Sequence, residues 1–558
     1  MSWHRFLLDA AVGVPLLLTA LALLPTRRGL MIRLLPFAAL PGLAAALLVP
    51  SGTAQPLPQT LLGAGLVMEA QGRVFLGIAA LLWTLAGITA RASVTGERRD
   101  RFAGFWLATL TGNMLLVLAA DVVSFYLAFA ILSLSAFGLV VHDGTAEARR
   151  AGRIYLLLAI VGETALLLGL LVAASGVGSV FIADIRSALP ALPRRDLALA
   201  LMIAGFGLKA GLVPLHVWLP LAHPAAPVPA SAVLSGAIVK AGIFGLMQFL
   251  PLGTALPDWS GALVTLGLTT AYYGVAAGLF QRRAKAVLAY STVSQMGLIV
   301  TVLGAGLASP GPGLALSAAG FYAAHHGLAK GALFLSVGVL HAAGGASRRP
   351  LLLLTGLTAL AIAGLPFTGG ALAKLAVKGP LGTGAAALLV TLSAVGTTLL
   401  MLRFLMLVRR DTPAPHLRPR PAVLLPFAGA ALAALTLPWL LFPAASGQAL
   451  AYAFSPATLW GAAWPLLLGA AILAGAVRWG RAAPVVPEGD LVAPAERLVN
   501  AAIGRAQEWQ APAPQLPLQG ALARVGAAAG RVEAAAARWP VIAPVLLAAV
   551  VVLALATV

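Results

Sequence analysis

Long apolar stretches, separated by short polar loops, dominate the chain. A helix needs about 20 apolar residues to cross the hydrocarbon core of a bilayer. By that length, transmembrane helices are expected at residues 5–25, 30–50, 73–91, 103–120, 122–141, 154–176, 197–220, 228–251, 259–281, 286–307, 312–341, 351–378, 383–408, 422–444, 459–477 and 541–558. The pattern predicts an all-α polytopic membrane protein with about 16 transmembrane helices.

The spacing of these stretches divides the chain into six parts. We expect three transmembrane helices in 1–100, a five-helix set in 101–252, a second five-helix set in 253–410, two further spans in 411–479, an amphipathic segment in 480–539 and a last span in 540–558. The segment 480–539 is rich in Ala, Arg, Glu and Pro. It is interpreted as two short amphipathic helices at about 495–510 and 519–538 lying along the cytoplasmic face of the membrane, or alternatively as a solvated linker.

The two five-helix sets, spans 4–8 and 9–13, can be laid over each other. Glu163 then falls near His326, Lys209 near Lys374, and Lys240 near Arg403. An odd number of spans in each set gives the two copies opposite topology. Inverted repeats with helix breakers at matching positions are typical of transporters, although similar loop lengths alone would also give this spacing.

Composition agrees with a membrane location. The chain is 60% hydrophobic, with a mean hydropathy of +0.96, which a soluble protein could not bury. It has no cysteine, so disulfides, thiolate metal sites and iron–sulfur ligation are excluded. We find no metal triad and no flavin or nicotinamide fingerprint, and expect no cofactor and no redox chemistry in this chain.

The net charge of +20 could suggest a nucleic-acid partner, but the distribution of the charges argues against one. Arginine is concentrated in loops after odd-numbered spans, at residues 27–33, 91–101, 149–153, 282–285, 348–349, 409–420 and 478–538. Basic loops stay on the cytoplasmic side. The odd loops are therefore expected in the cytoplasm and both termini outside.

Lysine is distributed differently from arginine. Every lysine except Lys285 falls within a predicted span. Arginine stays charged, whereas a buried lysine can lose its proton, so the cation that can titrate is concentrated at membrane depth. Lysines near span ends could instead extend to the interface, which suits Lys378. Glu163 is the one deep carboxylate, and Lys209 on the next span is its expected partner.

Helix breakers adjoin several of these groups. Residues 205–242 read GFGLKAGLVPLHVWLPLAHPAAPVPASAVLSGAIVKAG, with Lys209, His216, His223 and Lys240 among glycines and prolines. Broken backbone and charge at membrane depth are tolerated where they face protein or water. This stretch favours an ion or proton path.

A row of buried groups could carry that path. His326 and Lys330 are four residues apart and share one helix face. We expect a proton relay through Glu163, Lys209, Lys240, His326, Lys330 and Lys374, with His216, His223 and Arg403 as secondary members. The alternative is that each histidine is only hydrogen-bonded within the bundle.

Five stretches resemble one family, the antiporter-like proton-pumping subunits shared by respiratory complex I, group 4 membrane-bound hydrogenases and Mrp-type cation/proton antiporters. They are residues 207–246, QRRAKAVLAYSTVSQMG (281–297), HHGLAKGALFL (325–335), AGLPFTGGALAKLAVK (363–378) and MLRFLML (401–407). They run in the family's order over spans 4–13.

The resemblance implies two inverted five-helix half-channels with broken seventh and twelfth spans. It implies Lys209 as the central lysine and Lys240, His326, Lys330 and Lys374 as further members of a polar axis. It also implies a subunit of a redox-driven ion translocase, with other membrane subunits and a peripheral redox module as partners, in the inner (plasma) membrane of a prokaryote. The expected coupling ion is the proton, with sodium as an alternative.

The sequence departs from the family's pattern at three places. Phe129-Ala130 stands where a Trp-Glu pair is usual, Tyr322 where a histidine is frequent, and Arg283 where an acidic residue is common. Glu163 is left to replace the missing glutamate, or else the first half-channel is weakened. Three alternatives to proton pumping stay open: a sodium/proton antiporter, a subunit for inorganic-carbon uptake, and a non-conducting scaffold.

Overall fold

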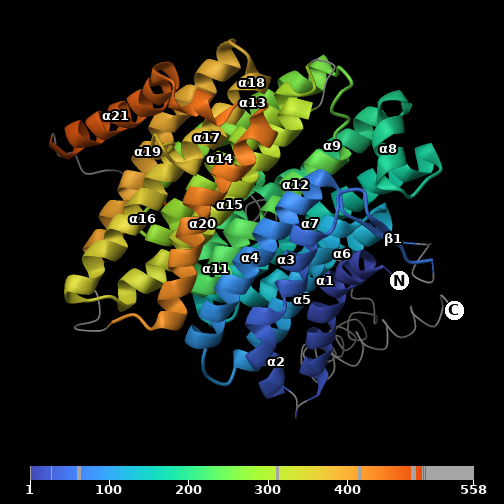
Figure 1. Ribbon diagram of the computed structural model, residues 1–558, viewed down its shortest axis with the longest axis horizontal. Helices are drawn as coiled ribbons and strands as arrows, with labels where there is room; N and C mark the ends of the chain where they lie inside the picture. The colour runs from blue at the N-terminus through green and yellow to red at the C-terminus, as the bar shows by residue number, and fades with distance from the viewer. Residues whose placement is uncertain are drawn as a thin grey trace, which may run out of the picture.

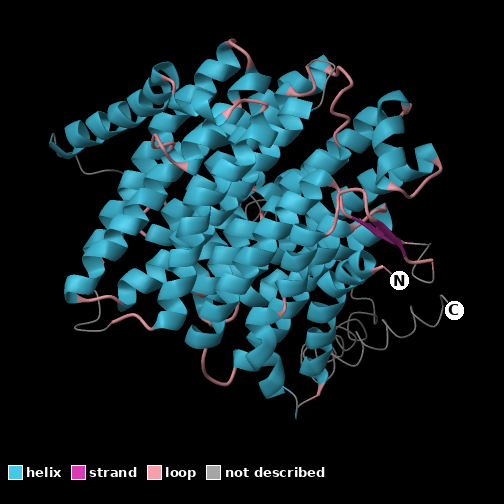
Figure 2. Cartoon of the chain, viewed as in Figure 1, coloured by secondary structure: helices cyan, strands magenta, loops and turns pink. Residues whose placement is uncertain are grey.

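The computed structural model describes residues 2–24, 26, 28–58, 64–308, 313–411, 418–478, 486–492, 494 and 497. Within them the chain is almost entirely helical (Figures 1 and 2). Helices occupy every predicted span except 541–558, which lies outside the described residues. Most of the predicted amphipathic segment 480–539 also lies outside them, except residues 486–492, 494 and 497. Twelve helices of the described part are long and apolar enough to cross a membrane.

The first part of the chain forms one side of the bundle. Its elements are α1 (Trp3–Ala20), α2 (Arg28–Leu34), α3 (Leu40–Leu48), a short antiparallel hairpin of β1 (Ala54–Pro56) and β2 (Gly65–Val67), and α4 (Ala70–Ser93). The hairpin lies at the edge of the molecule in Figure 2 and adds a feature that an all-helical expectation lacks. Asp121 ties it to the core by accepting a hydrogen bond from the Gly65 N–H.

The two five-span sets follow. The first contains α5 (Arg99–Leu118), α6 (Val122–Val140), α7 (Ala146–Val177), α8 (Ile182–Ala188), α9 (Arg195–Ala210), α10 (Trp218–Ala225), α11 (Val228–Val233) and α12 (Lys240–Phe249). The second contains α13 (Pro257–Leu279), α14 (Ala284–Ala305), α15 (Gly313–Ala342), α16 (Arg348–Ala363), α17 (Gly369–Ala376), α18 (Lys378–Leu381) and α19 (Ala385–Arg410). Helices α20 (Pro421–Ser446) and α21 (Pro456–Arg478) complete the bundle.

Local sequence explains where these helices begin and end. Asp121 caps α6 by accepting from the Ser124 N–H, and Thr145 caps α7 by accepting from the Ala148 N–H. Such side chains satisfy backbone donors that the first helical turn leaves free. Proline at the first turn begins α13 and α20, where its missing N–H costs nothing.

One span in each set is broken in a matching way. Helix α9 ends at Gly211 (φ 78°) and α16 ends at Gly364 (φ 102°). Both glycines adopt the left-handed conformation that ends helices, which side chains with a Cβ disfavour. A proline follows each of them, at Pro214 and Pro366. The expected breaks in the seventh and twelfth spans are therefore present, and Lys209 and Lys374 adjoin them.

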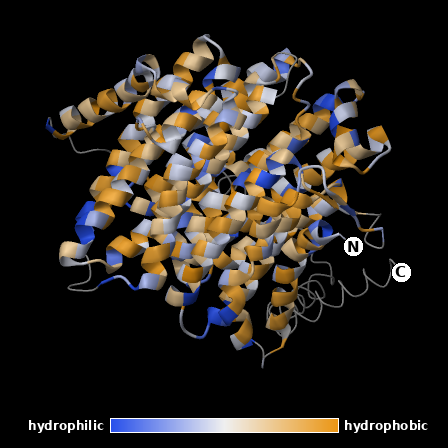
Figure 3. Cartoon of the chain, in the orientation of Figure 1, coloured by the Kyte–Doolittle hydropathy of each residue, from blue (hydrophilic) through white to orange (hydrophobic). Residues whose placement is uncertain are grey.

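The polar groups lie in the middle of the bundle, away from its apolar surface. Every residue in the apolar window of Val228–Phe249 and of Ala284–Ala305 is buried, against 11% for Pro456–Arg478. In Figure 1, α15 and α14 run through the centre while α21 lies at the periphery. Figure 3 shows hydrophilic residues mainly near helix ends and apolar ones over the outer helices. The candidate residues are thus shielded from lipid.

Candidate functional site

Lys209 lies in a closed polar site at the end of α9. Its Nζ donates to Ser133 Oγ at 2.7 Å and to Tyr155 OH at 3.3 Å. The same nitrogen faces the rings of Phe129 and Tyr155, at 5.7 and 5.6 Å from their centroids. Hydroxyl groups and aromatic faces therefore replace water around a side chain that is only 3% exposed.

Glu163, on α7, lines the same cavity as Lys209. The cavity measures about 10 Å³ and also touches Ser133 and Tyr155. Among the described residues no ion pair within 4.0 Å joins Glu163 to Lys209, and Glu163 Oε1 is buried without a hydrogen-bond partner. The predicted partnership is thus a proximity across a shared cavity, not a direct salt bridge.

Lys240 and His326 are in direct contact at the centre of the bundle. Lys240 Nζ lies 2.9 Å from His326 Nδ1 and also donates to the Ser235 carbonyl. Ser235 belongs to a π-helical turn at Leu234–Ile238, which precedes α12. Single π turns in helices are frequent at functional sites. This turn frees the Ser235 carbonyl from the regular helical pattern so that Lys240 can reach it.

Lys330 and His223 surround this pair. Lys330 Nζ donates to the Leu288 carbonyl at 3.0 Å. Its charge acts on His326, and the charge of Lys240 acts on Lys330. The His223 ring stacks on Phe334 with centroids 4.5 Å apart, and neither of its nitrogens has a partner in the described structure. His223 is also within electrostatic reach of Lys240 and Lys330. Four basic side chains thus lie close together, and no described carboxylate contacts any of them.

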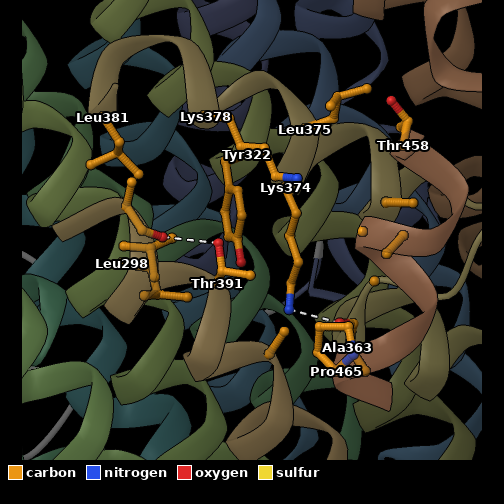
Figure 4. A pocket seen from close by; sticks show the side chains of 17 residues that line it. Leu298, Tyr322, Ala363, Lys374, Leu375, Lys378, Leu381, Thr391, Thr458 and Pro465 are labelled. Carbon is orange, nitrogen blue, oxygen red and sulfur yellow. Dashed lines mark hydrogen bonds between the residues drawn. The ribbon is translucent and has the colours of Figure 1, made fainter. Parts of the chain in front are cut away.

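Lys374 borders a third site beyond α15. Its Nζ donates to the Ala363 carbonyl at 2.7 Å. Ala363 is the last residue of α16 before the break. Figure 4 shows Lys374 and Tyr322 pointing into one cavity of about 50 Å³. Tyr322 OH donates to Gln295 Oε1 at 2.6 Å, so the residue that departs from the family's pattern joins the polar network. The charge of Lys374 acts on His325.

Helix α14 carries a polar stripe, two members of which bond to neighbouring helices at these sites, and sequence reasoning did not use it. Its members are Tyr290, Ser291, Thr292, Ser294 and Gln295, all buried. Thr292 Oγ1 is 2.8 Å from Ser235 Oγ, and Gln295 Nε2 donates to Thr397 Oγ1 at 3.1 Å. A cluster of five polar residues within one apolar span is the sequence feature that could have identified this stripe. Ser133 and Tyr155, which contact Lys209, are likewise polar residues within predicted spans.

Two predicted secondary residues lie apart from this row. Arg403 donates to the Gln281 carbonyl at 3.0 Å, beside the end of α13, and so lies near the surface. His216, fully buried between α9 and α10, faces Tyr273 and lies 3.4 Å (Nε2) from Asp490 Oδ1. The structure therefore brings Lys240, His326, Lys330 and His223 together, places Lys209 with Glu163, and sets Arg403 and His216 at one end of the bundle.

The donor set does not suit a metal ion. No group of three or more His, Cys, Asp or Glu side chains able to hold one occurs in the part of the chain that was described. Apart from the carboxylates of Glu163 and Asp490, the available groups are amines, imidazoles, hydroxyls and backbone carbonyls. These groups exchange protons and pass hydrogen bonds along, which fits proton transfer better than coordination.

Comparison with known proteins gives one family. The profile described as "NADH:quinone oxidoreductase/Mrp antiporter, TM" matches residues 119–402, which contain all the buried lysines and histidines discussed above. The match ends before α20 and does not reach Asp490.

Individual relatives agree with this match. An uncharacterized protein of Mycobacterium tuberculosis (strain ATCC 25618 / H37Rv) is 34% identical over 331 residues, 56% of this chain and 51% of the relative. Hydrogenase-4 component B of Escherichia coli (strain K12) is 37% identical over 250 residues, 42% of this chain and 37% of that one. The chain thus spans about half the length of the curated relatives it matches, or less.

A solved structure shares the fold. A chain in the structure of the Mrp complex from Dietzia sp. DQ12-45-1b superposes with a TM-score of 0.73 and 23% identity. The match covers 96% of this chain and 63% of that chain. At this identity the likeness concerns the arrangement of helices alone.

Proposed function

Since this chain belongs to the NADH:quinone oxidoreductase/Mrp antiporter transmembrane family, we propose that it is a proton-translocating, antiporter-like subunit of a complex I-like or group 4 hydrogenase-like membrane complex. Protons move along the buried groups Glu163, Lys209, Lys240, His326, Lys330 and Lys374. His223 is a secondary member of this row. The chain itself carries out no redox chemistry.

The contact between Lys240 and His326 supports this proposal most directly. Their nitrogens are 2.9 Å apart, and both side chains are almost completely buried. One nitrogen must donate and the other accept, so a proton can pass between them without solvent. With Lys330 nearby and no described carboxylate in contact, these groups cannot all be charged at once, because like charges repel strongly in a low-dielectric interior.

Lys209 and Glu163 start this transfer. Ser133 and Tyr155 hold the Lys209 amine through hydroxyl groups, which can donate or accept as its proton arrives or leaves. Glu163, across the same cavity, favours the charged lysine. Moving one charge across the membrane potential is worth about 2.3 kcal/mol per 100 mV. A modest change in the charge around Lys209 is therefore enough to shift its proton.

The surroundings of the subunit follow from the same proposal. We expect other membrane subunits and a peripheral redox module as partners, and lipid around the remaining surface. The protein is a multi-pass membrane protein, placed here in the inner (plasma) membrane of a prokaryote with its arginine-rich loops in the cytoplasm. Both termini then lie on the outer side.

A cation/proton antiporter subunit is the second candidate, because the matching family includes Mrp antiporters. Against it, the described residues offer no cluster of carboxylates for a sodium ion. A role in inorganic-carbon uptake is a further alternative. A non-conducting scaffold is favoured by Ala130, which replaces the usual glutamate.

Ion replacement separates the first two candidates. Proton uptake is measured in vesicles that contain the intact complex, with sodium and potassium replaced by choline. A proton pump retains its uptake rate, whereas an antiporter loses it and regains it when sodium or potassium is added. A scaffold is recognised by Lys209→Ala, which then leaves uptake unchanged.

A further inference from the structure

A short segment after α21 folds back onto the bundle beside the broken seventh span. Residues 486–492 contact α13, α14 and the loop between them. Gln281 Nε2 donates to the Val486 carbonyl at 3.3 Å, and Arg283 binds Glu488 as well as Glu147 of α7. Arg283 is one of the departures from the family's pattern, and here it fastens this docked segment.

The docked segment places one carboxylate, that of Asp490, in the interior of the bundle. The Asp490 side chain is only 8% exposed, and Tyr273 OH donates a hydrogen bond to it. Its Oδ1 lies 3.4 Å from Nε2 of His216, which is fully buried. The Leu491 N–H donates to the same oxygen at 2.8 Å, so backbone and side chains hold the carboxylate from several sides.

Asp490 is set up to stay ionised. Burial works to raise the pKa of Asp490, but the contacts from His216 and Tyr273 outweigh burial and hold that pKa below its ordinary value. The titratable groups that face the carboxylate are His216, Tyr273 of α13 and Tyr290 of α14. A buried anion needs a compensating charge, and His216 is the basic group among these three.

We propose that the docked segment 486–492 belongs to the proton path, because Asp490 positions His216 and compensates its charge so that this buried histidine carries a proton at the arginine-rich end of the bundle. The inference rests on the proposed function and adds a residue outside the family match. Asp490 is a positioning residue, and the transferred proton is held on His216. The His216 ring lies 6.0 Å from that of Tyr290, which begins the polar stripe of α14 toward Lys240.

Proton uptake by vesicles holding the intact complex tests this inference. Asp490→Asn keeps the shape and can still accept from Tyr273, but it removes the negative charge. We expect the uptake rate at pH 7 to fall about tenfold and its pH profile to move to lower pH, because a buried imidazolium forms less readily without a counter-charge. Asp490→Glu restores most of the rate. Asp411→Asn, which removes the carboxylate of the exposed His341–Asp411 pair, leaves the pH profile unchanged.

A double-mutant cycle keeps the test decisive even if Asp490→Asn releases the segment. If the two residues act as a unit, His216→Gln combined with Asp490→Asn is no slower than either single variant. Multiplicative losses, an unshifted pH profile in Asp490→Asn, or an equal shift in Asp411→Asn would each overturn the inference. Lys209→Ala is measured in parallel. Normal uptake there refutes the proposed function itself, whereas loss of uptake there with a normal Asp490→Asn refutes only the role of Asp490.

Discussion

At the scale of single residues, neutral groups hold the buried amines of this protein. Lys209 donates to Ser133 and Tyr155, Lys330 to a backbone carbonyl and Lys374 to another, while Lys240 contacts a histidine. A carboxylate in direct contact would fix the positive charge. Hydroxyl, carbonyl and imidazole partners leave each amine free to change its charge as its neighbours do.

Ser133 provides the shortest contact to Lys209 and is the first residue to test. Ser133→Ala removes a hydrogen bond to a charged group, worth about 1.5–3 kcal/mol, so proton uptake should fall about tenfold or more. Ser336→Ala is the matched control, because Ser336 is equally buried but bonds only to Leu333 of its own helix. Equal rates for both variants, measured by dye quenching in vesicles, would refute the importance of this contact.

His326 provides the corresponding test at the centre. His326→Ala deprives Lys240 of its side-chain partner, so we expect proton uptake to fall about tenfold or more. His341→Ala serves as a control, since His341 lies at the exposed end of α15 beside Asp411. A His326→Ala complex that assembles and pumps at the normal rate would show that the central contact is structural.

At the scale of elements, the two helix breaks place the lysines. Gly211 has a φ of 78°, and a Cβ there would lie 2.1 Å from Leu219 Cδ1. A regular helix through this point would remove the turn beside Lys209. The break thus depends on a glycine for both conformation and space.

Gly211→Ala should therefore destabilise the protein. The strained backbone alone costs about 1–2 kcal/mol, and the clash with Leu219 adds to it. Gly261→Ala, in a helix position with open space around it, should be neutral or slightly stabilising. Thermal unfolding of the purified complex in detergent measures both variants. An unchanged midpoint for Gly211→Ala would contradict the account of the break.

The docked segment 486–492 gives a prediction about pH. The pKa of Asp490 is held below its ordinary value, so the ionised carboxylate stabilises docking above about pH 3.9 and this stabilisation is lost as pH falls through the lowered pKa. Hydrogen exchange of the peptide around Val492, corrected for the intrinsic effect of pH, should show protection at neutral pH that disappears only in acid. In Asp490→Asn, protection should be weaker and independent of pH over this range.

The helices, both breaks and the buried lysines could be predicted from the sequence because these features depend on local patterns. Apolar length predicts spans, and glycine and proline beside Lys209 predict a break. The π turn before Lys240 and the docking of Asp490 against His216 could not be predicted from the sequence, since each depends on contacts between distant segments. The repeat spacing and the stretch MLRFLML predict Arg403 as a secondary member of the row, yet its side chain donates to the Gln281 carbonyl beside the end of α13.

At the scale of the whole molecule, an apolar shell encloses a polar interior that runs from α9 through α12, α14 and α15 to α17. Separate cavities lie beside Lys209 and Lys374, and hydrogen bonds join α12 to α15 and the π turn to α14 between them. The peripheral helix α21, by contrast, buries little of its own surface within the chain. This arrangement suits a subunit that moves protons inside itself while its outer helices face lipid or neighbouring subunits.

Proton uptake by vesicles holding the complex with Lys209→Ala or Glu163→Gln tests this account most directly. If the row carries protons and Glu163 replaces the missing glutamate of the fifth span (α6), both variants assemble, and both lose most of their uptake. Normal uptake in both assembled variants would contradict the account and leave the chain as a scaffold.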